Sequence, residues 1–213
     1  MVRIESSIDK TLIPEMPQVT FPGTITVVDT PEAAEEAIRY LSARKIVGFD
    51  TETKPSFKRG TFNRTALLQL SSHDRAFLFR LNVIGLTDGM RDFLANPKVK
   101  KIGVSVKDDF RSLGHHSQVS PASFVELQEL VAEFGIEEKG LQRMYALLFG
   151  QRISKSQQLS NWEADELTDK QCQYAAIDAW ACIIIYEYLC KLRRSGDYQI
   201  IKRNAEESIA EKG

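Results

Sequence analysis

Residues 46–52 read Ile-Val-Gly-Phe-Asp-Thr-Glu, and this stretch decides how the rest of the chain is interpreted. A short apolar run rich in β-branched residues predicts a buried strand. Because side chains alternate along a strand, Asp50 and Glu52 are expected on one face and Thr51 on the other. Two like charges at the end of a core strand repel each other, and a divalent cation with oxygen ligands would remove that cost. Exposed acids are common, so the pair indicates a cation site only if further carboxylates follow in the sequence.

The composition of the 213 residues is that of an ordinary globular protein, with 43% hydrophobic residues, 27% charged residues and a net charge of −1. We predict a loosely packed arm over residues 1–23, one domain over 24–194 and a charged tail over 195–213. No apolar run is long enough to span a membrane, and the N-terminus lacks a signal-peptide core. The spacing of the three cysteines matches no zinc module, and reduced thiols are expected. These features predict a cytoplasmic protein without a membrane partner.

Apolar periodicity predicts an α/β chain built on a mixed sheet, with strands early and helices late. The strand at 46–52 is expected to continue into an antiparallel meander with strands at 66–71 and 75–81. Further strands are expected at 24–28 and 101–105. Helices are expected over 31–43, 86–95, from residue 107, and over 125–134, 139–149 and 168–192.

Two more acidic positions lie downstream. Asp108 and Asp109 directly follow the strand at 101–105, where the helix dipole favours acids, and this suffices to explain Asp108. One of the pair should nevertheless face the carboxyl edge of the sheet. Asp178 interrupts a helix that is apolar on nearly all faces, and a buried aspartate needs a cation or a hydrogen-bond partner. Tyr174, one turn earlier on the same face, is the simplest such partner.

The ordered set of motifs resembles a known family. Asp50-x-Glu52, an acid in Gly103-Val-Ser-Val-Lys-Asp-Asp-Phe, and Tyr174-x-x-x-Asp178 are similar to the DEDDy branch of the DEDD 3′→5′ exonucleases. The segments Phe-Val-Glu-Leu at 124–127 and Leu-Ser-Asn-Trp at 159–162 are closer to the Werner type than to ribonuclease D. The register of the second motif selects Asp109 rather than Asp108. This chain has Ser105 where many relatives have asparagine.

The resemblance implies an RNase H-like fold, with a mixed central sheet flanked by helices, and makes residues 24–194 the exonuclease domain. It implies two divalent cations, Mg²⁺ or Mn²⁺, held by Asp50, Glu52, Asp109 and Asp178, while Tyr174 orients the attacking water. The reaction would be hydrolysis of nucleic-acid phosphodiesters to nucleoside 5′-monophosphates. The implied partner is a single-stranded 3′ end of DNA or RNA; no protein partner is predicted.

Three basic segments, 53–65, 97–107 and 139–158, contain no acid and suggest a track for phosphates. Lys54, Arg64 and Lys155 are candidate phosphate contacts. Trp162 is a candidate stacking platform for a base, and could equally be a core anchor.

Two other classes of function are alternatives. A catalytically inactive nucleic-acid binding or scaffold module could share the fold, although all four acids and the tyrosine are present. A weak response to Mn²⁺ in a calorimetric titration would identify such a module. A nucleotide-cofactor enzyme is disfavoured, because the chain has neither Gly-x-Gly-x-x-Gly nor a phosphate-binding Gly-Lys-Ser/Thr.

Overall fold

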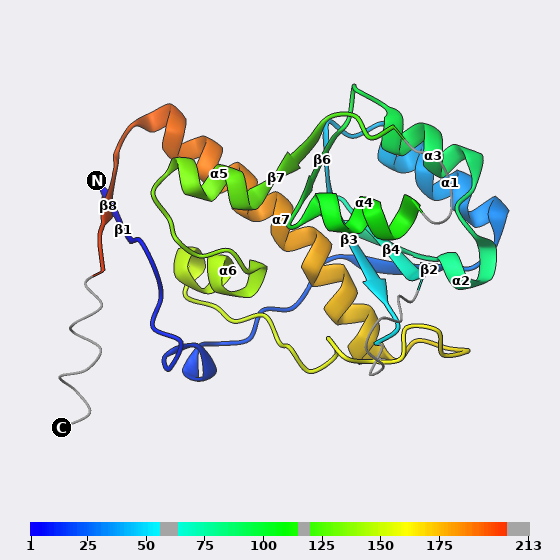
Figure 1. Ribbon diagram of the computed structural model, residues 1–213, viewed down its shortest axis with the longest axis horizontal. Helices are drawn as coiled ribbons and strands as arrows, with labels where there is room; N and C mark the ends of the chain where they lie inside the picture. The colour runs from blue at the N-terminus through cyan, green and yellow to red at the C-terminus, as the bar shows by residue number, and fades with distance from the viewer. Residues whose placement is uncertain (56–63, 115–119, 204–213) are drawn as a thin grey trace.

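The computed structural model describes residues 1–55, 64–114 and 120–203 (Figure 1). Its centre is a six-stranded mixed sheet with the strand order β2-β5-β4-β3-β6-β7. The strands are β2 (Thr24–Val28), β3 (Ile46–Thr53), β4 (Thr65–Ser71), β5 (Arg75–Arg80), β6 (Lys100–Gly103) and β7 (Phe124–Glu126). The predicted mixed sheet with flanking helices is therefore confirmed.

The meander expected from the sequence is present, because β4 pairs antiparallel with both β3 and β5. The other three pairings, β2 with β5, β3 with β6 and β6 with β7, are parallel. Every residue of β4 is buried, which fits a central strand covered on both faces. The register places Gln69 opposite Asp50, and it shifts between Glu52 and Thr53.

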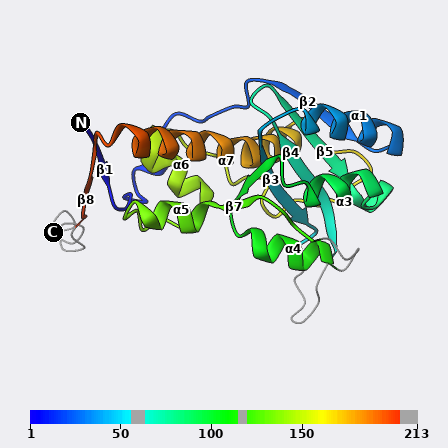
Figure 2. The ribbon, with the colours of Figure 1, turned by 90° about the horizontal axis from the view of Figure 1, so that it is seen from above.

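Helices cover both faces of the sheet (Figures 1 and 2). Side chains of α1 (Pro31–Ser42), α3 (Asp88–Ala95) and α4 (Val106–Gly114) share one core cluster with β3, β4 and β5. The long helix α7 (Asp169–Ser195) crosses the opposite face and contacts β2 to β6. Helices α5 (Leu127–Glu133) and α6 (Leu141–Phe149) pack on α7, and the short α2 (Leu81–Ile84) follows β5. No helix in the described part of the chain has the length and apolar character needed to cross a bilayer.

Strand β3 and helix α7 approach each other very closely at Gly48. A Cβ atom at this position would lie 1.8 Å from the carbonyl oxygen of Ala179. Only glycine allows this approach, because any side chain would meet backbone atoms that cannot rotate away. The contact places residue 178 of the helix beside residue 50 of the strand.

One prediction about the elements was wrong, and one helix begins later than expected. The first residues do not form a loose arm: β1 (Val2–Glu5) pairs in parallel with β8 (Tyr198–Ile201), and the short turn η1 (Ile13–Glu15) follows. This pairing joins the two ends of the chain, so no local periodicity could reveal it. The helix expected over 125–134 begins two residues later, after β7. Of the predicted tail, residues 204–213 lie outside the described residues, and the domain boundaries remain a prediction.

Candidate active site

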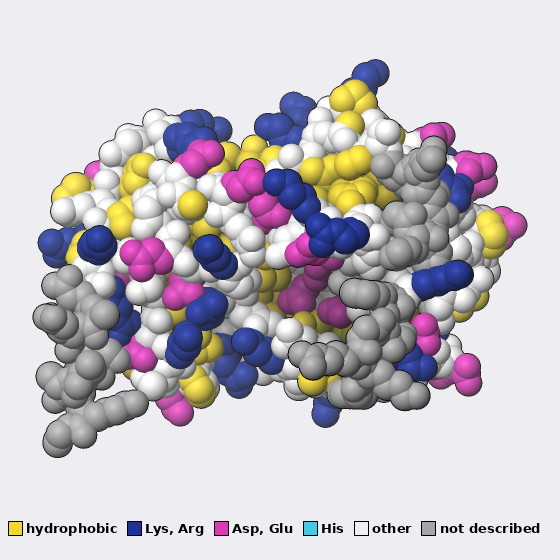
Figure 3. All heavy atoms as spheres, in the orientation of Figure 1, with side chains coloured by type: hydrophobic (Ala, Val, Ile, Leu, Met, Phe, Trp, Pro, Cys, Tyr) yellow, Lys and Arg dark blue, Asp and Glu magenta, His cyan; other side chains and the backbone are white. Residues whose placement is uncertain are grey.

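Three of the four predicted carboxylates come together at one place. Asp50 and Glu52 project from β3 and Asp178 from α7, and their ligand oxygens all lie within 4.8 Å of one another. They line a hollow of about 390 Å³, together with Tyr174 and Lys155. Figure 3 shows acidic side chains deep in a hollow near the middle of this face. The alternation of β3 and the approach at Gly48 together produce the cluster.

The cluster is electrostatically unfavourable without a cation. Burial, followed by the charge of Asp178, raises the pKa of Asp50 well above its usual value. Burial and the neighbouring acids, Asp50 first among them, raise the pKa of Glu52 to about 9. Burial also raises the pKa of Asp178 to about 7. At neutral pH the cluster therefore retains protons, which a cation with oxygen ligands would displace.

Tyr174 lies beside these carboxylates, one helical turn before Asp178, and is 6% exposed. Burial, and then the charges of Asp178 and Glu52, raise the pKa of its phenol. The phenol therefore remains a hydrogen-bond donor at neutral pH. It lies close enough to Asp178 to oppose the rise in the pKa of that carboxyl. Even so, the buried Oδ1 of Asp178 has no hydrogen-bond partner among the described residues, so a pair with Tyr174 alone does not satisfy it.

Asp109 approaches from the side of α4 and is not one of the three clustered carboxylates. Its Oδ1 accepts a hydrogen bond of 2.6 Å from the Thr51 hydroxyl group. Its buried Oδ2 has no partner among the described residues. Burial and the charge of Asp50 raise its pKa to about 8. The neighbouring Asp108 is 72% exposed and pairs with Arg111 at 2.9 Å, so the geometry agrees with the choice of Asp109.

Glu126, which lies in the Phe-Val-Glu-Leu motif but had no predicted role, binds the N-terminus of α4. Its carboxylate oxygens accept hydrogen bonds from the backbone N–H groups of Ser105 at 3.0 Å and Val106 at 2.8 Å. It also caps α5 by accepting from the Gln128 N–H at 3.1 Å. One side chain thus caps the N-termini of two helices, α4 and α5, where unpaired backbone N–H groups favour an anion. Glu126 therefore helps to set the position of Asp109.

Two further polar residues near the site were missed. The strand alternation predicted only that Thr51 lies on the face of β3 opposite to Asp50 and Glu52. From that face its hydroxyl group donates a hydrogen bond to Asp109. Gln69 pairs with Asp50 across the sheet and is 1% exposed, yet neither polar atom of its amide has a partner among the described residues. A glutamine within the apolar run Leu-Leu-Gln-Leu was the available signal.

The four predicted nucleic-acid contacts have different surroundings. Lys155 is exposed and lines the carboxylate hollow, and Arg64 is exposed at the entrance to β4. The amino group of Lys54 pairs with Glu163 at 3.1 Å. Trp162 is fully buried and packs beside Tyr174, with ring centroids 6.0 Å apart. A buried ring offers no face to a base, so stacking is not supported and Trp162 is a core anchor. Residues 56–63 of the first basic segment lie outside the described residues.

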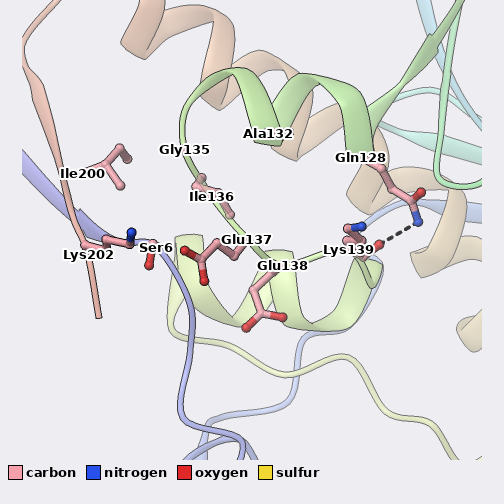
Figure 4. Close-up of a pocket in the computed structure, with 10 residues that line it drawn as sticks. All are labelled: Ser6, Gln128, Ala132, Gly135, Ile136, Glu137, Glu138, Lys139, Ile200 and Lys202. Carbon is pink, nitrogen blue, oxygen red and sulfur yellow. Dashed lines mark hydrogen bonds between the residues drawn. The ribbon is translucent and has the colours of Figure 1, made fainter. Parts of the chain in front are cut away.

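A larger hollow of about 570 Å³ lies elsewhere, between α5, the loop that leads from α5 to α6, and β8 (Figure 4). The Gln128 amide donates to the Lys139 carbonyl oxygen at its edge. Its one buried acid, Glu138, is already paired with Arg143 at 3.1 Å. The size of a hollow therefore does not identify the candidate active site. The buried carboxylates without hydrogen-bond partners identify it.

Comparison with known proteins agrees with this geometry. A family model described as 3′-5′ exonuclease matches residues 25–193. The mouse bifunctional 3′-5′ exonuclease/ATP-dependent helicase WRN is 33% identical over 206 residues, which cover 91% of this chain but 14% of that protein. The Nibbler EXO domain of Aedes aegypti superposes with a TM-score of 0.76 at 21% identity, covering 85% of this chain and 95% of that one. Ribonuclease D of Trypanosoma brucei, in complex with RNA U12, gives a TM-score of 0.70 at 20% identity, covering 79% and 63%. The two structures confirm the predicted RNase H-like fold.

Proposed function

Because the chain belongs to the 3′-5′ exonuclease family, as its motifs predicted, we propose that it is an active exonuclease that uses two divalent cations, Mg²⁺ or Mn²⁺. The observation that carries this proposal is the set of buried, mutually repelling carboxylates. Asp178 and Asp109 each have one buried oxygen without a hydrogen-bond partner among the described residues, and a divalent cation with oxygen ligands would satisfy both. The proposed products are nucleoside 5′-monophosphates released from the 3′ end.

In the proposed mechanism, Asp50, Glu52 and Asp178 would hold one cation, and Asp109 and Asp50 would hold the second. When bound, a pair of cations stabilises the charges that develop on the attacking and leaving oxygens of a phosphodiester. The Tyr174 phenol orients the attacking water by a hydrogen bond. It does not act as a base, because its raised pKa keeps its proton in place at neutral pH.

The proposed substrate is a single-stranded 3′ end of DNA or RNA. Lys155 and Arg143 line the carboxylate hollow and can neutralise phosphates next to the scissile one. The structural likeness to an RNA-bound ribonuclease D supports a nucleic-acid substrate. We also propose a cytoplasmic location, since Cys172, Cys182 and Cys190 are all free thiols.

End-labelled DNA and RNA strands, incubated with Mg²⁺, Mn²⁺ or EDTA, test this function. A 5′ label should give a ladder that shortens from the 3′ end, and a 3′ label should appear first as a mononucleotide. Asp178→Asn serves as the matched inactive control. Activity that survives exhaustive chelation, or digestion of circular strands, would contradict the proposal. Tight strand binding without turnover in either metal would instead identify an inactive binding module.

A further inference from the structure

A second, basic groove opens beside the carboxylate hollow. It measures about 530 Å³, and its lining includes Lys10, Arg143, Arg152 and Lys155. No carboxylate belongs to the described residues that line it. The groove and the carboxylate hollow share Arg143 and Lys155 in their linings, so the two lie side by side. Figure 3 shows Lys and Arg side chains gathered beside the hollow that holds the acids.

The N-terminal segment forms one wall of this groove and is firmly attached. The Arg152 N–H donates to the Pro17 carbonyl oxygen, and the Val19 N–H donates to the Arg152 carbonyl oxygen, both at 3.0 Å. The Arg152 guanidinium Nε also donates to the Met16 carbonyl oxygen at 3.0 Å. These bonds hold the segment that carries Lys10 against the chain that follows α6.

The cations of the groove differ in how much of their charge is available. Arg143 is paired with the buried Glu138 at 3.1 Å. Lys10 and Lys155 are exposed, and neither forms an ion pair within the described part of the chain. Two strongly hydrated, unpaired ammonium groups beside a catalytic hollow favour a polyanion.

A different hollow on the other side of Tyr174 has no excess of basic residues in its lining. It measures about 400 Å³, and its lining carries one acid, Asp169, and one base, Lys170. A phosphate backbone leaving the carboxylate cluster therefore gains more from the basic groove than from this one.

We propose that the basic groove binds the sugar-phosphate backbone of the substrate strand on the 5′ side of its terminal nucleotide, with Lys10 as a phosphate contact. This inference rests on the proposed function and extends it. Lys10 lies before residue 25, where the match to the family model begins, so this contact belongs to the N-terminal segment of this chain. The segment predicted as a loose arm is thereby assigned a substrate-binding role.

The test measures binding of 5′-fluorescein DNA and RNA strands of increasing length by anisotropy, in Mg²⁺, with Asp178→Asn as the background to prevent digestion. Lys10→Glu should weaken binding of the longer strands roughly fivefold, since one phosphate contact is lost and a repulsion is added. The slope of log Kd against log salt should fall by about 0.7, the value for one contact on a single strand. Lys10→Gln, which removes the charge alone, should give the same change in slope with a smaller loss of affinity.

Lys45→Glu is the matched control, because Lys45 is exposed, lies outside the three basic segments and lines none of the four hollows described above. It makes the same change in net charge and should leave Kd and slope unchanged. Lys170→Glu should have less effect than Lys10→Glu. If Lys45→Glu and Lys10→Glu weaken binding equally, the groove is not a specific binding track. A larger effect of Lys170→Glu would place the strand in the other hollow.

A separate measurement distinguishes this inference from the proposed function. The wild-type protein is assayed with Mn²⁺ on the p-nitrophenyl ester of thymidine 5′-monophosphate, a phosphodiester with no upstream nucleotides, and on labelled strands. If it cleaves both and Lys10→Glu binds strands like its background, the groove inference is wrong and the function stands. If it cleaves neither while Lys10→Glu still weakens binding, the groove stands and the proposed hydrolysis is wrong.

Discussion

Replacing Gly48 by alanine is expected to damage the active site without changing any of its functional groups. The added Cβ would lie 1.8 Å from the Ala179 carbonyl oxygen and 2.5 Å from the carbonyl carbon. Both are backbone atoms, so no side chain can rotate to relieve the clash. Strand β3 and helix α7 must move apart instead, and they carry Asp50 and Asp178.

The size of the effect follows from these distances. Ordinary van der Waals contact begins at 3.4 Å, so the two backbones must separate by about 1.6 Å at this point. That is a large displacement for carboxylate oxygens that now lie within 4.8 Å of one another. A misplacement of about 1 Å can lower a rate roughly 100-fold, which we take as the expected loss in kcat. Overpacking costs about 1–3 kcal/mol, equivalent to a fall in Tm of about 2–12 °C for a domain of this size.

The assay compares Gly48→Ala with Gly89→Ala. Gly89 lies in α3, and a Cβ there would meet nothing within 4 Å. The control should keep full activity and gain up to about 1 kcal/mol of stability, because alanine is the better helix former. Turnover of a 5′-labelled strand, Mn²⁺ affinity by calorimetry and Tm are measured for both proteins, with circular dichroism to verify folding.

A folded Gly48→Ala protein that retains near wild-type turnover and Mn²⁺ affinity would contradict this prediction. That result would mean that the carboxylates tolerate separation of strand and helix, and that the close approach serves packing alone. A loss of activity only through unfolding would also be visible, because the circular dichroism spectrum would change together with the rate.

Other predictions concern the individual groups. Tyr174→Phe should lower turnover about 100-fold and leave Mn²⁺ affinity unchanged; loss of Mn²⁺ binding would show that the phenol shapes the metal site itself. Asp109→Ala should reduce activity far more than Asp108→Ala. The reverse order would show that Asp108, and not the Asp109 carboxylate bonded to Thr51, is the functional acid. Burial raises the pKa of Glu52 to about 9 and that of Asp109 to about 8, so the folded apoprotein binds more protons than the unfolded chain. The stability that these two groups contribute in EDTA should therefore be fully present below about pH 4 and be lost as pH rises towards 9. Asp50→Ala should raise Tm near pH 8, and a wild-type Tm in EDTA that does not fall over this pH range would argue against repulsion between the buried carboxylates.

Local periodicity determined much of the site in advance. Alternation along a strand put Asp50 and Glu52 on one side, because successive side chains of any strand point in opposite directions. The helical repeat likewise put Tyr174 and Asp178 on one face. The meander could be located for the same reason, since it depends on neighbours in the sequence. The choice of Asp109 over Asp108 came instead from the resemblance of its motif to the family.

Only the tertiary structure decided which of these faces meet. Asp178 reaches Asp50 because α7 lies directly on Gly48, and nothing in either local pattern specifies that approach. The same holds for Trp162, whose burial depends on residues from β4, β5 and α7. Lys10 reaches the groove through hydrogen bonds between its segment and residues more than 130 positions away. Strand and helix periods are properties of neighbouring residues, whereas distances between remote segments depend on how the whole chain packs.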